Sequence, residues 1–257
     1  TLVDLPAQAI PHLTGPARPI LLLPRRADAP VAAQVAPGLD EMGVLLPYAP
    51  LHHLLFATRP DGLPGAPAVL VMTSGNRSGE PLCHTDADAL TRLAGIADLF
   101  CLHDRAIAVP CEDSVLAWQD GEVIPLRRSR GFAPLPVRLA DGGEPGVVLA
   151  AGAEIKNTFA LARDGWAFVS AHVGDLGTLE SQSAHHLATA QMLRFHRATP
   201  ALVVTDRHPG YASRAWAHTF AAEHDVPVLE VQHHHAHLAA LAAEHGRLSE
   251  PLLGLVF

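Results

Sequence analysis

The sequence predicts an α/β protein with two domains, and three observations support this prediction. Short apolar runs bounded by Pro, Gly and Asn are typical of buried strands. Longer stretches combine apolar periodicity with cap residues, which is typical of helices. The polar stretch Val137–Gly146, with three glycines and one proline, divides two apolar-rich segments and is the best linker. We therefore expect one domain over residues 1–140 and a second over residues 146–257.

Strand and helix signals are mixed in the first half of the chain. Asp120-Gly121 favours the positive φ angles of a tight hairpin turn, and Thr85 opens a helix with a Thr/Asp cap pattern. The expected elements are the strands Pro19–Leu23 and Ala68–Thr73, the helix Thr85–Leu93 and the hairpin strands Leu116–Gln119 and Glu122–Leu126. This half is therefore predicted to be α/β or α+β with a substantial sheet.

The second half has a more regular order. Asp164-Gly165 predicts a second hairpin, after which helices and strands alternate. The expected strands are 147–151, 158–162, 166–170, 201–205, 226–231 and 252–257, and the expected helices are 181–197, 212–223 and 234–245. This series matches the core of the ribonuclease-H-like, actin and sugar-kinase architecture. Ligands bind there where strand ends and the first hairpin face a cleft, although a fold alone does not define a function.

Composition and charge exclude several classes of protein. The net charge of −8 argues against a protein that mainly binds nucleic acid. The lack of an apolar run of about eighteen residues argues against a membrane span. Three cysteines without a C-x-x-C spacing indicate buried thiols in a reducing cytoplasm rather than a disulfide framework or a zinc ribbon. The single lysine among eighteen basic residues, Lys156, marks a position where arginine does not replace a compact ammonium group.

His233 and His237 stand four residues apart in VQHHHAHLAALAAEHG (Val231–Gly246), a stretch with five histidines. Residues with this spacing share a helix face, so both imidazoles can reach one cation, and neutral imidazole suits zinc and iron. Two ligands do not complete a tetrahedral site, and one or two more are required from elsewhere. Solvated histidines at a helix N-terminus are the alternative, and the spacing alone does not decide between the two.

Two further stretches have the chemistry for phosphate binding. Thr73–Pro81 (TSGNRSGEP) follows an apolar run, and its hydroxyl and backbone N–H groups can hold phosphate oxygens, unless it is an ordinary polar loop. Arg127–Gly131 carries three arginines in four residues, and planar guanidinium groups bind phosphate through paired hydrogen bonds. A solvated edge strand, on which basic residues deter pairing, is the alternative.

Two more charged residues lie at predicted strand ends. Lys156 falls in the turn between the first two strands of the second half, which approaches nucleotide phosphates in actin-like folds. Asp206 ends a later strand, and its carboxylate is a ligand, a general base or, most simply, a helix cap.

Eight motifs follow one another along nearly the whole chain and are specific when taken together. They are LPYAPLHHLL (46–55), VMTSGNRSGEP (71–81), IADLFCLHDR (96–105), EDSV (112–115), LRRSRGFAPLPV (126–137), GAEIKNTFAL (152–161), HVGDL (172–176) and VQHHHAHLAALAAEHG. With them the chain resembles the HypF family, the carbamoyltransferases of NiFe-hydrogenase maturation.

The resemblance implies a fold and a chemistry for each half. Residues 1 to about 140 resemble the later part of a YrdC-like domain, which activates a carbamoyl group with Mg-bound ATP as carbamoyl-adenylate. Residues from about 146 resemble the first half of an actin/sugar-kinase-like transferase domain. The implied substrate is carbamoyl phosphate, and the implied partner is the C-terminal cysteine thiol of a HypE-like acceptor, on the way to the cyanide ligands. Neither nucleic acid nor a membrane is an expected partner.

The resemblance also implies the site residues. It assigns Ser74 and Asn76 to the nucleotide, with Arg128 and Arg130 as phosphate contacts. One iron or zinc ion is assigned to His233 and His237, where it would polarise the carbamoyl carbonyl. We add Lys156 as a catalytic residue that holds the phosphates.

The chain departs from the family pattern in several ways. The family carries an acylphosphatase-like module, C-x-x-C zinc fingers and a basic start of the YrdC-like domain upstream of the part matched here, and it continues beyond Phe257 into an Asp-Gly-Thr-Gly segment that supplies a carboxylate ligand. It also usually carries a basic residue near Pro110, where this chain reads Ala108-Val109-Pro110-Cys111. We therefore expect that this chain, as a piece of a longer protein, does not catalyse carbamoyl transfer alone. The alternatives are threonylcarbamoyl-adenylate chemistry for tRNA modification, O-carbamoylation of a small molecule, and a metal-binding docking module. Acidic charge argues against the first, and the order of the domains argues against the first two.

Overall fold

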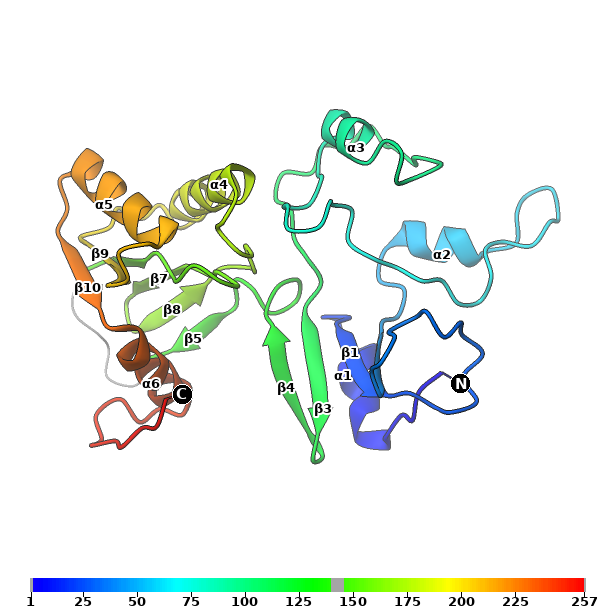
Figure 1. Cartoon of the computed structure of the whole chain (residues 1–257), viewed down its shortest axis with the longest axis horizontal. Helices are drawn as coiled ribbons and strands as arrows, with labels where there is room; N and C mark the ends of the chain where they lie inside the picture. Colours follow the sequence, from blue (N-terminus) through cyan, green and yellow to red (C-terminus); the bar gives the residue numbers. More distant parts are fainter. Residues whose placement is uncertain (1, 140–145, 257) are drawn as a thin grey trace. The chain divides into compact units, whose positions relative to one another are not determined.

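The computed structural model describes residues 2–139 and 146–256 (Figure 1). Contacts divide the chain into two compact units, Thr1–Ser74 with Glu112–Phe132, and Gly75–Cys111 with Ala133–Phe257. The predicted domains, residues 1–140 and 146–257, stay a prediction. Part of the predicted linker lies in strand β5 (Pro136–Arg138), and residues 140–145 lie outside the described part of the chain. Within the described residues, no helix has the length and apolar character to cross a membrane.

The first unit is built on a four-stranded sheet in the order β2-β1-β3-β4. Strand β1 pairs antiparallel with β2 and parallel with β3, which forms an antiparallel hairpin with β4. Asp120 and Gly121 both have positive φ, as the hairpin prediction requires. The elements are η1 (Ala7–Ala9), α1 (Ile10–Thr14), β1 (Ile20–Pro24), β2 (Glu41–Val44), α2 (Pro50–Phe56), β3 (Val115–Gln119) and β4 (Glu122–Arg127).

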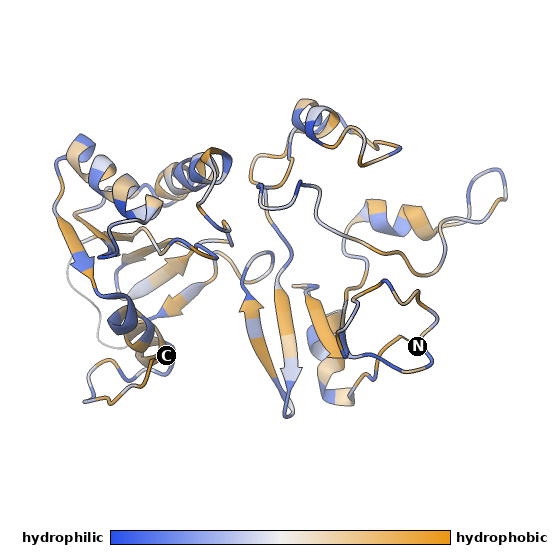
Figure 2. Cartoon of the chain, viewed as in Figure 1, coloured by the Kyte–Doolittle hydropathy of each residue, from blue (hydrophilic) through white to orange (hydrophobic). Residues whose placement is uncertain are grey.

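Apolar side chains on β1 and β3 make the core of this unit. Leu21 and Leu23 are fully buried, because alternate residues of a strand point to the same face. They pack with Leu13, Met42 and Leu116, and Figure 2 shows the apolar residues gathered on these strands. The sheet of the first half is therefore confirmed.

The second unit contains a six-stranded sheet in the order β10-β9-β6-β7-β8-β5. Strands β6, β9 and β10 are parallel, whereas β7, β8 and β5 continue the sheet as antiparallel neighbours. The succession β6, β7, β8, α4, β9, α5, β10 and α6 along the chain is the one that the sequence predicted, and β5 is added at one edge of the sheet. The elements are α3 (Asp86–Arg92), β5, β6 (Val148–Ala150), β7 (Ala160–Arg163), β8 (Trp166–Val169), α4 (Leu179–His196), β9 (Leu202–Asp206), α5 (Ala212–His224), β10 (Val228–Val231) and α6 (His233–Glu244).

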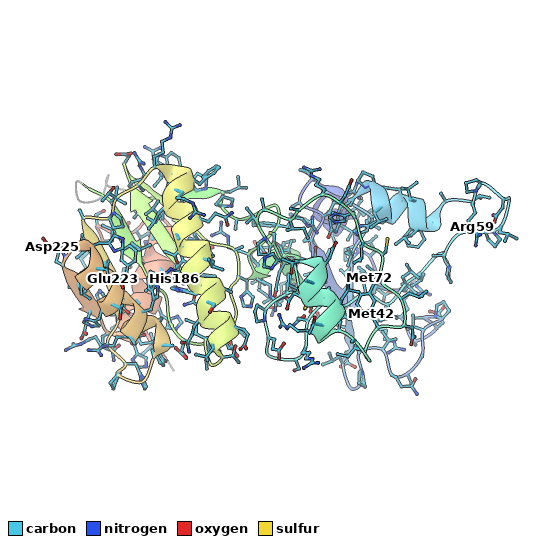
Figure 3. The ribbon with its side chains drawn as sticks, turned by 90° about the horizontal axis from the view of Figure 1, so that it is seen from above. Met42, Arg59, Met72, His186, Glu223 and Asp225 are labelled. Carbon is cyan, nitrogen blue, oxygen red and sulfur yellow. The ribbon has the colours of Figure 1, made fainter. Side chains whose placement is uncertain are left out.

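Helices α4 and α5 lie side by side over this sheet (Figure 1). The Trp216 indole on α5 donates to His186 Nδ1 on α4 at 3.3 Å, and Figure 3 labels His186. The same indole meets the buried His185 ring edge-on, with ring centroids 4.6 Å apart. Helix α4 begins with a capping box, in which Thr178 Oγ1 accepts from the Ser181 amide at 3.1 Å. The contacts of Trp216 therefore hold the two helices against each other.

Two predicted strands are absent among the described residues. Residues 68–73 form no strand, because no neighbouring strand pairs with them and Val71 is 76% exposed. Residues 252–256 also form none, with Leu253 97% exposed, and Phe257 lies outside the described residues. An apolar run forms a strand only where another strand pairs with it, and the sequence pattern does not show whether such a partner strand exists.

Candidate functional site

Three side chains converge where strand β9 ends and helix α6 begins. Asp206 is the last residue of β9, and its Oδ2 lies 2.5 Å from His233 Nδ1 in the first turn of α6. His233 Nε2 in turn lies 3.1 Å from His237 Nε2, one helical turn further on. The predicted pair of histidines is therefore brought together, and a carboxylate stands behind one of them.

The geometry of this pair fits a shared cation. Two nitrogen ligands of a tetrahedral zinc ion lie roughly 3.3 Å apart, given Zn–N bonds of about 2.0–2.1 Å. The two Nε2 atoms meet this spacing to within a few tenths of an ångström, and a carboxylate on the outer nitrogen is the usual support of a metal-binding imidazole. Within residues 2–139 and 146–256, no group of three or more His, Cys, Asp or Glu residues that could hold a metal occurs. The described residues thus offer two nitrogen ligands, fewer than a tetrahedral ion requires.

Asp206 is almost buried, with 8% of its side chain exposed. Burial opposes ionisation of its carboxyl group, but the hydrogen bonds from His233 and from the His208 amide outweigh burial and hold its pKa below the ordinary value. Its Oδ1 accepts from the His208 amide at 2.8 Å, in the turn that follows β9. The prediction that Asp206 caps the following helix was wrong, because no hydrogen bond joins it to the first turn of α5 in the described structure.

The loop between β6 and β7 provides the cap of α5 instead. Glu154 Oε2 accepts from the amide of Ala212, the first residue of α5, at 2.7 Å. Asn157, which is buried, donates from Nδ2 to the carbonyls of Ala151 and Ala153 at 3.1 and 2.6 Å. The sequence motif GAEIKNT marked this loop, but it did not show which residue holds which partner.

Lys156 stands at the tip of this loop with its side chain exposed. Its φ of 49° is the left-handed region, which is uncommon for residues other than glycine. Its amide donates to Asp175 Oδ1 at 2.6 Å, so the HVGDL motif holds the backbone of the lysine. The lysine is therefore presented on a fixed turn, and its catalytic role stays a prediction.

Arg130, predicted as a phosphate contact, is engaged with protein groups in the first unit. Its Nη1 donates to Ala17 O at 2.6 Å, and its Nη2 donates to Arg18 O at 2.8 Å. Nη2 also pairs with Asp113 Oδ1 at 2.5 Å, and the guanidinium carbon lies 3.5 Å from the centroid of the Tyr48 ring. Residues of three motifs therefore meet on this one side chain, and sequence reasoning had assigned no role to Asp113 or Tyr48.

Burial changes the acidity of groups around this arginine. Burial and the charge of Asp113 raise the pKa of Tyr48, although Arg130 acts in the opposite direction. Burial, together with the Asp113 charge, also raises the pKa of Glu112 despite its ion pair with Arg127. For Glu112, desolvation therefore outweighs the attraction to Arg127.

The other predicted nucleotide contacts have fewer protein partners. The Nη2 of Arg128 lies 3.4 Å from Phe132 O, at the limit of a hydrogen bond. Ser74 is exposed in a segment without regular structure, at the end of the first unit. Asn76 Nδ2 donates to the carbonyls of Arg77 and Glu80 at 3.0 and 2.7 Å and thereby closes its own loop. Their role at a nucleotide stays a prediction.

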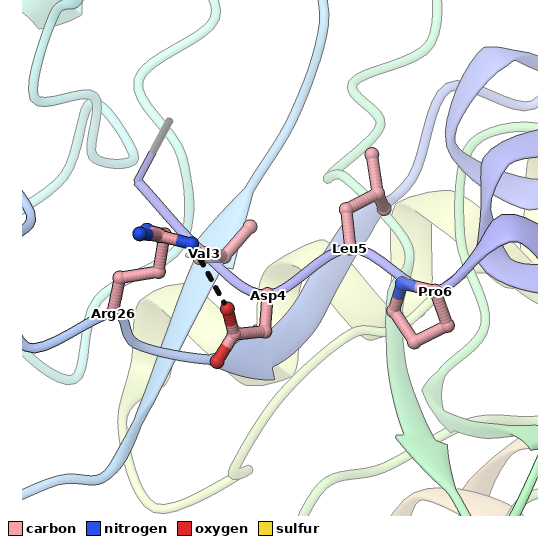
Figure 4. Close-up of a pocket in the computed structure, with 5 residues that line it drawn as sticks. All are labelled: Val3, Asp4, Leu5, Pro6 and Arg26. Carbon is pink, nitrogen blue, oxygen red and sulfur yellow. Dashed lines mark hydrogen bonds and ion pairs between the residues drawn. The ribbon is translucent and has the colours of Figure 1, made fainter.

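None of the predicted site residues lines the surface pocket of the first unit. Val3, Asp4, Leu5, Pro6 and Arg26 line it, as Figure 4 shows. Arg26 Nη1 and Asp4 Oδ1 form an ion pair at 3.4 Å across it. Because both charges are largely exposed to solvent, this pair gives no reason to place chemistry here.

Two family models match successive parts of the chain. The Sua5/YciO/YrdC family model, described as telomere recombination, matches residues 4–129. The model described as HypF Kae1-like domain matches residues 144–244. The predicted order, a YrdC-like part followed by an actin-like transferase part, is confirmed.

Relatives match the chain almost end to end. Carbamoyltransferase HypF2 of Cupriavidus necator is 48% identical over 255 residues, which cover 95% of this chain and 31% of the relative. Carbamoyltransferase HypF of Synechocystis is 40% identical over 95% of this chain and 30% of the relative. The chain thus spans about a third of the length of these relatives.

Two solved structures of HypF proteins are also similar to this chain over almost its whole length. Full-length HypF in the phosphate- and nucleotide-bound form is 36% identical, with a TM-score of 0.82 over 95% of this chain and 37% of that one. The crystal structure of T. kodakarensis HypF is also 36% identical, with a TM-score of 0.86 over 95% of this chain and 31% of that one. Both similarities confirm the fold class predicted from the sequence.

Proposed function

Because the chain belongs to the HypF family of carbamoyltransferases, we propose that it contributes to an enzyme that activates carbamoyl phosphate with ATP as carbamoyl-adenylate. The carbamoyl group then passes to the C-terminal cysteine thiol of a HypE-like protein, for synthesis of the cyanide ligands. The observation that carries the transfer half of this proposal is the convergence of His233 and His237 at the end of β9. A cytoplasmic location and Mg-bound ATP belong to the same proposal.

Four residues divide the work in the transferase half. His233 and His237 would hold one iron or zinc ion through their Nε2 atoms, and Asp206 would keep His233 oriented. An ion there supplies a positive charge that neutralises phosphate and polarises a carbonyl. Lys156, on its fixed turn, would hold phosphate oxygens with its ammonium group.

In the first half, Arg128 is the arginine best placed to hold a phosphate. Its guanidinium makes one long hydrogen bond to Phe132 O, whereas Arg130 is already bound to two carbonyls and a carboxylate. Ser74 and Asn76 would hold other parts of the nucleotide. Arg130 would act indirectly, by holding the loop that contains it. For Arg130 to contact phosphate directly, its bonds to the two carbonyls and to the carboxylate would have to break.

Zinc titration of the purified chain against a chelator tests the metal half. Zinc binding should be lost in His233→Ala and in His237→Ala, and kept in His218→Ala. His218 is a matched control because it pairs with Glu230 in the same unit, at 2.8 Å. Unchanged zinc binding in both site variants would refute the assignment.

Calorimetric titration with Mg-ATP tests the nucleotide half. Binding by the wild-type chain and its loss in Arg128→Ala are expected, and a wild-type chain that binds no ATP would refute the assignment. Mass spectrometry of a HypE-like protein incubated with the chain, Mg-ATP and carbamoyl phosphate should show no carbamoylated cysteine, since we expect the chain alone to be inactive. Capture of the HypE-like protein without ATP binding or metal binding would instead support a docking function.

A further inference from the structure

The two imidazoles of the His233–His237 pair are not equivalent. His233 Nδ1 faces the Asp206 carboxylate at 2.5 Å, whereas no hydrogen bond to His237 Nδ1 occurs among the described residues. Only 8% of the Asp206 side chain is exposed, and its other oxygen is held by the His208 amide. The carboxylate therefore has one fixed position from which to act on His233.

An ionised carboxylate can only accept hydrogen bonds. Nδ1 of His233 must therefore carry the hydrogen, and in the neutral ring Nε2 then presents its lone pair. Since His237 Nε2 lies 3.1 Å from that lone pair, His237 completes the contact by donating from its own Nε2. Before a cation binds, the pair thus holds one nitrogen that is ready to coordinate and one that is protonated.

We infer that Asp206 is a positioning residue that fixes His233 in the Nδ1–H tautomer and makes it the preset ligand of the pair. His237 is the ligand that must rearrange: one proton leaves Nε2 and one is taken up at Nδ1, so the charge of the ring does not change. This inference rests on the metal site of the proposed function, but its first test does not require a metal.

The tautomers can be read directly from nitrogen–proton correlation spectra of the metal-free chain with ¹⁵N-labelled histidine, at about pH 8, above the ordinary histidine pKa of about 6.5. His233→Ala and His218→Ala assign the signals. His218 is an internal control, because Glu230 faces its Nε2 at 2.8 Å rather than its Nδ1. The wild-type chain should therefore show His233 with hydrogen on Nδ1 and His218 with hydrogen on Nε2.

Substitutions of Asp206 and Glu230 then show which of these two carboxylates controls the tautomer of His233 and the affinity for zinc. Asp206→Asn leaves one acceptor oxygen for two donors, so His233 should populate both tautomers and zinc affinity should fall about 10–100-fold. Glu230→Gln weakens the ion pair of Glu230 with Arg214, but among the histidines it should alter only His218. Zinc affinity should stay within about twofold of wild type, since His218 is not a ligand.

Each outcome tests a separate part of the inference. His233 with hydrogen on Nε2 in the wild-type chain would overturn the inference. This measurement uses the wild-type chain, so it tests the inference even if Asp206→Asn does not fold. Wild-type zinc affinity in a folded Asp206→Asn would also overturn it, and so would a complete loss of zinc binding equal to that of His233→Ala, because Asp206 would then be a ligand itself. A wild-type chain with the expected tautomer but no zinc binding would refute the proposed metal site and leave the tautomer assignment standing.

Discussion

Replacing Arg130 with alanine should destabilise the first unit far more than replacing Arg128. The Arg130 side chain is 23% exposed, donates to two backbone carbonyls and pairs with Asp113. A hydrogen bond to a charged group contributes about 1.5–3 kcal/mol, and an ion pair that is only partly buried contributes less than a fully buried one. Because these contributions overlap, we expect a total loss of about 2–4 kcal/mol. Arg128 has one hydrogen bond of 3.4 Å, and its removal should cost less than about 1 kcal/mol.

Urea unfolding followed by the fluorescence of Trp118 measures this difference. Trp118 lies in β3 of the first unit, whereas the other two tryptophans, Trp166 and Trp216, lie in the second unit. In a background with both of those changed to phenylalanine, the signal reports on the first unit alone. ATP binding in the same background should fall in Arg128→Ala without a loss of stability.

Two results would refute this reasoning. An Arg130→Ala variant within about 1 kcal/mol of its parent would show that the carbonyl and carboxylate bonds contribute little. An Arg128→Ala variant as unstable as Arg130→Ala would show that the two guanidinium groups are not distinguished by their partners.

Three further predictions concern the second unit, each measured by thermal or urea unfolding with Trp216 fluorescence. Gly152→Ala should destabilise it by more than about 2 kcal/mol, since the φ of 75° is left-handed and the new Cβ would lie 2.1 Å from Thr158 O. Gly177→Ala, with no atom within 4 Å, should be nearly neutral, and equal losses in the two variants would contradict the argument. Thr178→Ala should cost about 1 kcal/mol through loss of the capping box of α4, and an unchanged midpoint would show that the box does not stabilise the helix. Burial lowers the pKa of His185 below its ordinary value of 6.5, so the unfolded chain binds this proton more readily. Its contribution to stability is complete above pH 6.5 and is lost as the pH falls through 6.5 toward the folded pKa, and His185→Gln should flatten this dependence relative to wild type. The same pH slope in both proteins would exclude His185 as its source.

Local patterns in the sequence predicted most of the second unit, because the residues that form its turns, caps and helix contacts are close in the sequence as well as in space. Asp164 and Gly165 both have positive φ, as their hairpin requires, and Thr85 caps α3 from the position next to it, as predicted. The i, i+4 spacing of His233 and His237 predicted their contact for the same reason, because one helical turn joins them. The runs 68–73 and 252–256 had equally apolar patterns but no partner strand among the described residues, so the same reasoning failed there.

The partners of the site residues were beyond sequence reasoning, since they are distant along the chain. Asp206 stands 27 residues before His233, and Arg130 meets Ala17 across a separation of 113 residues. A carboxylate at a strand end has the same appearance in a sequence whether it caps a helix or supports an imidazole. Its function depends on which side chain the neighbouring strand and helix place opposite it. The choice between a metal pair and a solvated helix end therefore depends on Asp206, which prepares one of the two imidazoles for a cation before any cation is bound.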